Sequence, residues 1–76
     1  MNNRDESQLY ALEERFYGET VDLIRDAVVS QERKRQWVDK GMALLVRAQY
    51  ATSSREYAAI VAQFDALEEA IRTAVA

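Results

Sequence analysis

The hydrophobic residues in the last third of the chain recur at intervals of three and four. From residue 54 onward the main apolar positions are Tyr57, Ile60, Val61, Phe64, Leu67 and Ile71. This spacing places them on one face of an α-helix. Just before it, Ser53 and Glu56 fit a capping box, in which the Ser hydroxyl and the Glu carboxylate each bind the other residue's free amide. The pattern predicts a turn at 51–53 and an amphipathic helix over 54–75.

The segment from about residue 31 to residue 50 also has helical spacing, and folding it back at 51–53 gives an antiparallel hairpin. The register of that hairpin pairs Trp37 with Leu67, Gly41 with Phe64, Leu44 with Ile60, and Ala48 with Tyr57. Glycine in the middle of a helix costs roughly 1 kcal/mol relative to alanine, and this register explains it as space for Phe64. The same register predicts ion pairs of Arg47 with Glu56, Lys40 with Asp65, and Arg35 with Glu68 or Glu69.

The first third of the chain has two adjacent apolar stripes, one containing Leu9, Leu12, Phe16 and Leu23, the other Tyr10 and Tyr17. This surface is broader than one partner helix covers. A break near 18–20 or 29–30 would bury it in a three-helix bundle. A continuous helix would bury it against a second copy of the chain. Because no segment between 18 and 50 has turn residues like those at 52–54, we favour the continuous helix.

The sequence therefore predicts one all-α domain over residues 1–76. We expect a long first helix over about 5–50, straight or kinked, a shorter C-terminal helix, and a homodimer that forms a helical bundle. The residues expected in the core or at the dimer interface are Leu9, Leu12, Leu23, Trp37, Leu44, Ile60, Phe64 and Leu67.

The amino-acid composition limits the catalytic and metal-binding chemistry that the chain can carry out. The chain is 49% hydrophobic and 30% charged, and it has two glycines but no proline, cysteine or histidine. Without cysteine there is no disulfide, thiolate metal site or cysteine nucleophile. Without histidine the commonest metal ligand and general base are missing. The adjacent carboxylates Glu13–Glu14 and Glu68–Glu69 diverge on a helix, so neither pair converges on one metal ion. We expect no catalytic residue, metal or cofactor.

Charge is distributed unevenly along the chain. Residues 1–30 carry seven acidic and three basic side chains, whereas residues 31–50 carry five basic and two acidic ones. The basic segment includes Arg33, Lys34 and Arg35, which could bind phosphates or balance the neighbouring acidic helices. Because the whole chain has a net charge of −3, we favour the second interpretation, and nucleic acid remains the alternative partner.

The aromatic residues suggest where a partner would bind. Tyr10, Phe16 and Tyr17 lie where the hairpin leaves the first helix uncovered, so they serve either a dimer interface or another protein. Tyr50 and Tyr57 are expected to pack together beside the turn, and Met42 is expected in the core. Aromatic residues and arginine are enriched where partners bind tightly. The predicted contact residues are therefore Tyr10, Phe16, Tyr17, Arg33, Lys34 and Arg35.

These observations favour a small non-catalytic protein that binds another protein and inhibits or regulates it. Its size suits a phage- or mobile-element-encoded inhibitor of a host protein. The alternative is a nucleic-acid-binding or structural oligomerisation subunit that uses the basic residues between 33 and 47. The N-terminus lacks the apolar core of a secretory signal, and unbroken apolar runs such as Met42–Val46 are far too short to cross a membrane. We expect a cytoplasmic location.

Overall fold

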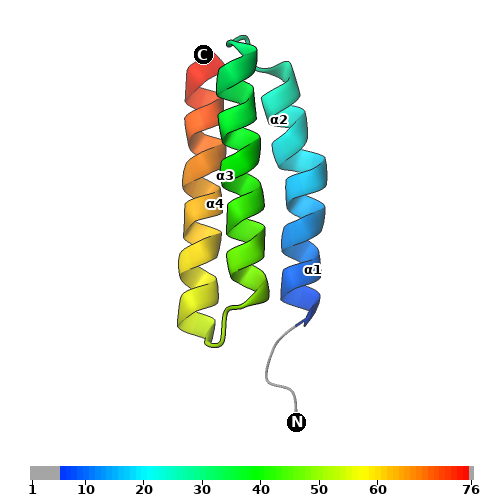
Figure 1. Cartoon of the computed structure of the whole chain (residues 1–76), viewed down its shortest axis with the longest axis vertical. Helices are drawn as coiled ribbons and strands as arrows, with labels where there is room; N and C mark the ends of the chain where they lie inside the picture. Colours follow the sequence, from blue (N-terminus) through cyan, green and yellow to red (C-terminus); the bar gives the residue numbers. More distant parts are fainter. Residues whose placement is uncertain (1–5, 76) are drawn as a thin grey trace.

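The computed structural model describes residues 6–75 and is helical throughout, apart from two short connections. The first helical rod comprises α1 (Glu6–Arg15), the π-helical turn η1 (Phe16–Thr20) and α2 (Val21–Asp26) without interruption. The second rod is α3 (Gln31–Gln49) and the third is α4 (Ser54–Val75). The three rods lie side by side, with α1 and α4 starting at the same end of the bundle (Figure 1).

The all-α prediction is confirmed, but the single long helix over 5–50 is wrong. Its predicted start at residue 5 lies outside the described residues. The chain leaves the helix at Ala27, whose ψ of 141° is extended, and starts α3 from Ser30, whose ψ is 155°. The Ser30 hydroxyl accepts a 3.2 Å hydrogen bond from the Arg33 amide, a standard N-cap. Lys34 Nζ donates a 2.9 Å hydrogen bond to the Arg25 carbonyl oxygen near the end of α2.

The other proposed break, at 18–20, is instead a wide turn through which the helix continues. There the Val21 amide reaches the Phe16 carbonyl oxygen, five residues back. In a regular α-helix, residues spaced by four are rotated by about 40° relative to one another, so a row of them moves gradually off one face. A π turn, which is wider, compensates for this rotation. The buried residues Phe16, Thr20 and Ile24 therefore all face the bundle axis.

Two apolar clusters fill the core. The cluster nearer the start of α1 consists of Leu12, Phe16, Leu44, Leu45, Ala48, Ile60 and Phe64, with Leu9 packed against it. The other consists of Ile24, Ala27, Trp37, Leu67 and Ile71, with Leu23 packed against it. The first rod thus buries its own apolar stripe against α3 and α4. The stripe of Leu9, Leu12, Phe16 and Leu23 is therefore covered within the chain, whereas Tyr10 and Tyr17 of the second stripe stay exposed.

Gly41 makes room for a different residue from the one predicted. A methyl group built on Gly41 would overlap Cε1 of Phe16 and lie 2.8 Å from Cδ1. Phe16 is 1% exposed, and its ring meets the Phe64 ring edge-on at 6.1 Å. Phe16, the first residue of η1, is therefore a core residue that packs the first rod on α3, not a residue of a partner surface.

The turn between α3 and α4 is capped much as predicted, with one change. The Ser53 hydroxyl accepts a 3.1 Å hydrogen bond from the Glu56 amide. The Glu56 carboxylate accepts from the Thr52 amide at 2.9 Å, one residue earlier than in a capping box. The hydrogen bonds that the carboxylate accepts from the Thr52 amide and hydroxyl hold the pKa of Glu56 below its usual value. Tyr57 packs against the core, but Tyr50 is 73% exposed and does not help to close the turn.

Candidate functional site

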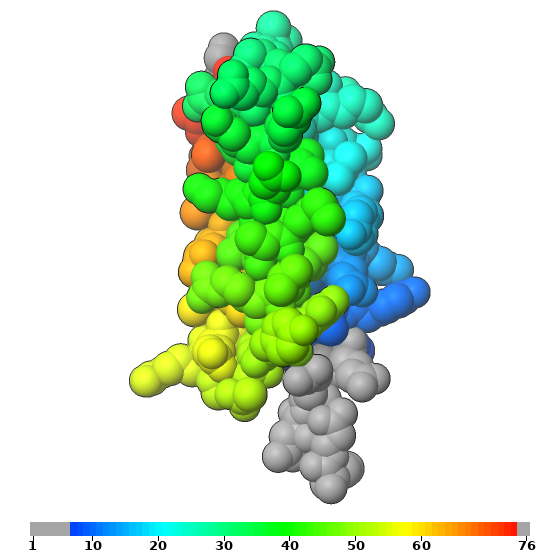
Figure 2. All heavy atoms as spheres, viewed as in Figure 1, coloured from blue at the N-terminus to red at the C-terminus, as the bar shows by residue number. Residues whose placement is uncertain are grey.

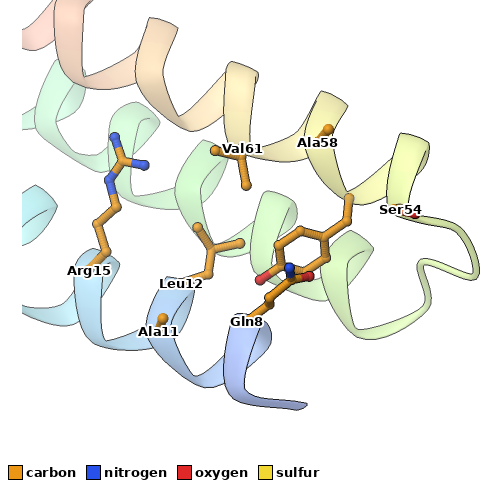
Figure 3. A pocket seen from close by; sticks show the side chains of 8 residues that line it. Gln8, Ala11, Leu12, Arg15, Ser54, Ala58 and Val61 are labelled. Carbon is orange, nitrogen blue, oxygen red and sulfur yellow. The ribbon is translucent and has the colours of Figure 1, made fainter. Parts of the chain in front are cut away.

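An open groove of about 590 Å³ runs between α1 and α4 at the end of the bundle where both helices begin (Figure 3). Its walls are mostly apolar, with three polar side chains. The lining residues are Gln8, Ala11, Leu12, Arg15, Ser54, Tyr57, Ala58 and Val61. Grooves of this size with an apolar lining and a few polar groups are typical of binding sites.

Small side chains explain why the groove stays open. Ala11 and Ala58 lie on opposite walls, and neither side chain extends beyond Cβ (Figure 3). At the other end of the bundle, Ile24, Leu67 and Ile71 fill the corresponding space in a continuous cluster. The bundle is therefore packed shut at the α2 end and open at the α1 end.

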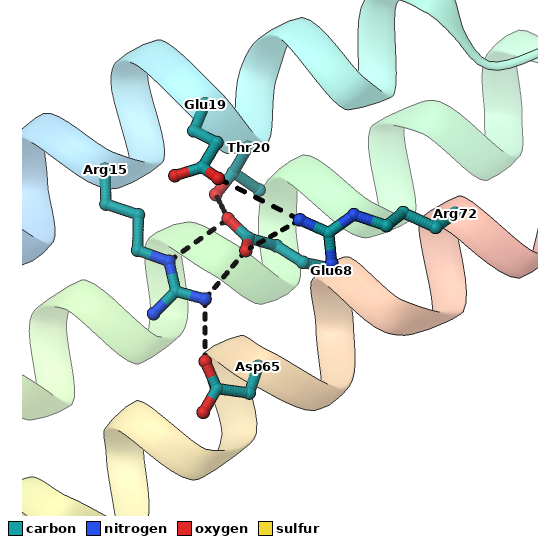
Figure 4. A network of polar contacts seen from close by, with 6 residues as sticks. All are labelled: Arg15, Glu19, Thr20, Asp65, Glu68 and Arg72. Carbon is teal, nitrogen blue, oxygen red and sulfur yellow. Dashed lines mark hydrogen bonds and ion pairs between the residues drawn. The ribbon is translucent and has the colours of Figure 1, made fainter.

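A polar network around the buried carboxylate of Glu68 adjoins the groove through Arg15, which lines the groove (Figure 4). Glu68 is 1% exposed. Arg15 donates two hydrogen bonds to its carboxylate, from Nε to Oε2 at 3.2 Å and from a terminal nitrogen to Oε1 at 2.7 Å. The Thr20 hydroxyl donates a 2.5 Å hydrogen bond to Oε2, and Asp65 accepts a 2.7 Å bond from Arg15. This fork-like pairing fixes α1 and η1 against α4.

The surroundings keep Glu68 ionised. Burial alone would raise the pKa of its carboxyl group, but hydrogen bonds from Arg15 and Thr20 and the charges of Arg15 and Arg72 outweigh burial. The pKa therefore lies below its usual value. The hydrogen bond to Glu68 outweighs the cost of burial for Arg15 as well, so the pKa of the guanidinium is raised.

The network also leaves negative charge at the surface. Arg72 lies 3.7 Å from Glu68 and 3.9 Å from Glu19 (Figure 4). Two arginines therefore serve three carboxylates. The Asp65 and Glu19 side chains are 64% and 60% exposed. A positively charged group approaching this end of the groove would meet an uncompensated negative charge.

The predicted ion pairs of the hairpin are replaced by this network. Asp65 and Glu68, which had been matched with Lys40 and Arg35, bind Arg15 instead. Arg47 donates a 3.3 Å hydrogen bond to the Gln63 side chain, while its charge helps to lower the pKa of Glu56. The register pairs the correct helices but omits the first rod, because it treats that rod as part of a single long helix.

The six predicted contact residues are not brought together. Tyr10 and Tyr17 are 64% and 61% exposed, and neither lines the groove. Arg33 lies over the Trp37 ring, 5.4 Å from its centroid. Lys34 caps α2, as described above, and Arg35 is exposed. Two of the three basic residues thus make contacts within the fold.

The sequence did contain signals for the residues that were missed. Glu68 falls on the apolar stripe of its helix, between Leu67 and Ile71, and Thr20 falls between Phe16 and Ile24. A polar residue on a buried stripe needs a partner. That requirement predicts a link between the two helices, although it cannot identify Arg15 as the second member.

No three acidic side chains in residues 6–75 gather as metal ligands. Over the same range, no helix combines the length and the apolar character needed to cross a lipid bilayer. Comparison with family models, curated proteins and solved structures found no match for this chain.

Proposed function

We propose that this protein is a non-catalytic interaction module that binds a basic amphipathic helix of a partner protein in the α1–α4 groove. The observation that carries the proposal is the groove itself, an apolar trough between two helices. Binding an amphipathic helix along such a groove is a common mode of peptide recognition.

The walls of the groove suit apolar side chains at helical spacing. Leu12, Tyr57 and Val61 provide the apolar surface, and Ala11 and Ala58 leave the space above it. A partner helix with apolar residues at intervals of three and four would place them in this trough. At the other end of the bundle, between α2 and α4, no such space is left, because Ile24, Leu67 and Ile71 pack together there.

Charge selects a basic helix over an acidic one. Asp65 binds Arg15, which lines the groove; the Asp65 side chain is 64% exposed and shares Arg15 with Glu68. A lysine or arginine on the partner, one or two turns from its apolar residues, would meet the excess negative charge described above. Complementary charge of this kind mainly sets specificity and association rate. The bound helix would be withheld from its other contacts, which would inhibit or regulate the partner.

The proposal is tested by selecting binders from a displayed library of amphipathic helices whose polar faces are either basic or acidic. We expect basic helices to be enriched. Their binding should be lost in Ala58→Trp, which fills the groove, and kept in Ala59→Trp, which adds the same ring to an exposed position outside the groove lining.

Two results would overturn the proposal. One is enrichment of acidic helices, or of neither class. The other is binding that survives Ala58→Trp while circular dichroism shows both variants to be folded. Arg35→Glu is a further control, since Arg35 does not line the groove and its reversal should leave binding by selected helices within about twofold.

A further inference from the structure

We propose that the partner helix lies in the groove antiparallel to α1 and α4, so that its lysine or arginine residues precede its apolar residues in sequence. This inference rests on the proposed function and adds a direction to it. It also assigns Asp65 as the residue that sets this direction. A helix with the same residues in the opposite order would bind more weakly.

The two ends of the groove differ in the residues that line them. The outer end, where α1 and α4 begin, is lined by the uncharged residues Gln8 and Ser54. The inner end, about two helical turns further along, is lined by Arg15 and Val61 (Figure 3). Of the eight described residues that line the groove, only Arg15 is charged. A bound helix can therefore distinguish the two ends by their charge.

Negative charge gathers at the inner end. Asp65 lies one turn beyond Val61 on the same face of α4. Its carboxylate is 64% exposed although it binds Arg15. The network to which both belong has three carboxylates and two arginines, so it is negative overall (Figure 4). A cation on the partner gains most where it can reach Asp65.

The exposed charged side chains beside the groove have the same polarity. Glu14 and Glu69 are exposed next to the network, so both add negative charge at the inner end. Arg55 is exposed in the first turn of α4 and adds positive charge at the outer end. Glu56, in the same turn, directs its carboxylate to the amide and hydroxyl of Thr52. The outer end therefore disfavours a cation relative to the inner end.

The directions of the helices favour the same orientation. Both α1 and α4 begin at the outer end (Figure 1). The first turn of a helix carries a partial positive charge, and the last turn carries a partial negative one. A partner antiparallel to α1 and α4 therefore sets its negative C-terminal turn beside two positive helix ends. Its positive N-terminal turn then lies beside the excess carboxylates.

The bundle already contains a helix with this direction. The helix α3 runs antiparallel to α1 and α4, and in Figure 2 its side chains lie between those of the first rod and those of α4. All eight lining residues of the groove come from α1 and α4, so a partner in the groove lies across from α3. With the direction of α3 it would be antiparallel to both of its neighbours, as in an up-and-down four-helix bundle.

Two synthetic helices of identical composition test the direction. Both have the same apolar stripe, with lysines either in the turn before it (lysine-first) or in the turn after it (lysine-last). Both are stapled on the polar face, so that each is helical before binding, and have blocked ends without terminal charges. Fluorescence anisotropy at low salt measures their affinities. We expect the lysine-first helix to bind at least about fivefold more tightly.

A matched pair of variants tests the role of Asp65. Asp65→Asn should reduce the preference for the lysine-first helix to within about twofold, because the exposed carboxylate is gone. Asp39→Asn removes the same charge from an exposed position on α3 and should leave the preference unchanged. Equal preferences in the two variants would mean that Asp65 does not set the direction.

A nitroxide on the N-terminus of the lysine-first helix shows the direction itself. We expect it to broaden the amide signals of Glu19 and Asp65 more than those of Gln8 and Ser54. Stronger broadening of the Gln8 and Ser54 signals would show the opposite orientation.

The outcomes separate this inference from the proposed function. If neither helix binds, or if binding survives Ala58→Trp, the proposed function fails and the direction fails with it. If both helices bind, both are lost in Ala58→Trp, and the lysine-last helix binds as tightly as the other or more tightly, only the direction is overturned.

Discussion

The first rod (α1, η1 and α2) meets its two neighbours in different ways. Against α3 it is seated by the Phe16 ring on Gly41, where a single added methyl group would overlap the ring. Against α4 it is held by the Arg15–Glu68 pair and then stands away, leaving the groove. One contact is apolar and tightly packed, and the other is polar at one point and open beyond it.

The size of the facing side chains explains the difference. A glycine opposite a phenylalanine lets two helices approach closely, as interlocking packing requires. Two alanines opposite each other, Ala11 and Ala58, are too small to fill the space between α1 and α4. The helices cannot move together locally to close the gap, because Leu12, Phe16 and Ile60 hold them in place from the core side. The same bundle can therefore be both well packed and concave.

The largest expected effect breaks the tight contact. Phe16→Ala should lower the free energy of unfolding by about 3–5 kcal/mol, the usual cost of deleting a buried aromatic ring. Tyr17→Ala, one residue away and 61% exposed, should cost less than about 1.5 kcal/mol, including its edge contact with Phe16. Urea unfolding followed by circular dichroism measures both values. Equal losses would mean that Phe16 does not seat α1.

The next effect breaks the polar contact. Arg15→Met should lower the free energy of unfolding by about 1–3 kcal/mol, because Glu68 would keep its burial but lose its main donor. Arg25→Met is the matched control. Arg25 is 66% exposed and pairs only with Asp22 and Asp26, so its loss should cost no more than about 1 kcal/mol. An Arg15 variant as stable as the Arg25 variant would contradict the role of the network.

A smaller effect appears as a pH dependence. The pKa of Glu68 is lower in the folded chain than in the unfolded one, so its stabilisation is complete above the unfolded pKa of about 4.3. It is lost as the pH falls through the folded pKa. The free energy of unfolding, measured at several values between pH 6 and pH 3, should therefore change less with pH for Glu68→Gln than for the wild type. Identical slopes would show that Glu68 is not held ionised.

The smallest effect compares the two glycines. Nothing lies within 4 Å of a methyl group built on Gly18, so Gly18→Ala should raise the free energy of unfolding by about 0.5–1 kcal/mol. Gly41→Ala should change it in the opposite direction, because Phe16 must shift. Differential scanning calorimetry gives both signs, and a stabilising Gly41→Ala would count against the close contact.

The last helix was the easiest part to predict. Its apolar spacing and the hydroxyl-rich turn before it agree with α4, which runs from Ser54 to Val75. The break between α2 and α3 was named as an alternative but not favoured, because its only local signal is the single capping residue Ser30, without the carboxylate partner that marks Ser53. The Lys34 bond that also closes it joins residues nine apart, which no helical pattern reveals.

The candidate site was harder to predict for a physical reason. A groove is defined by side chains that are missing, here those of Ala11 and Ala58, and alanine in a helix is ordinary in any sequence. Phe16 was misplaced because an apolar residue at the right spacing fits a core and an interface equally well. Only the fold-back at 27–30 decides between them.

The most direct test of the central claim, that α1 has an open groove on one side and a closed contact on the other, is an amide chemical-shift map. A basic amphipathic helix from the selection is titrated into the labelled protein. We predict that the amides of Ala11, Ala58 and Val61 shift, while those of Tyr17 and Met42 stay in place. Shifts confined to Tyr17 and Met42 would contradict the groove as the binding site.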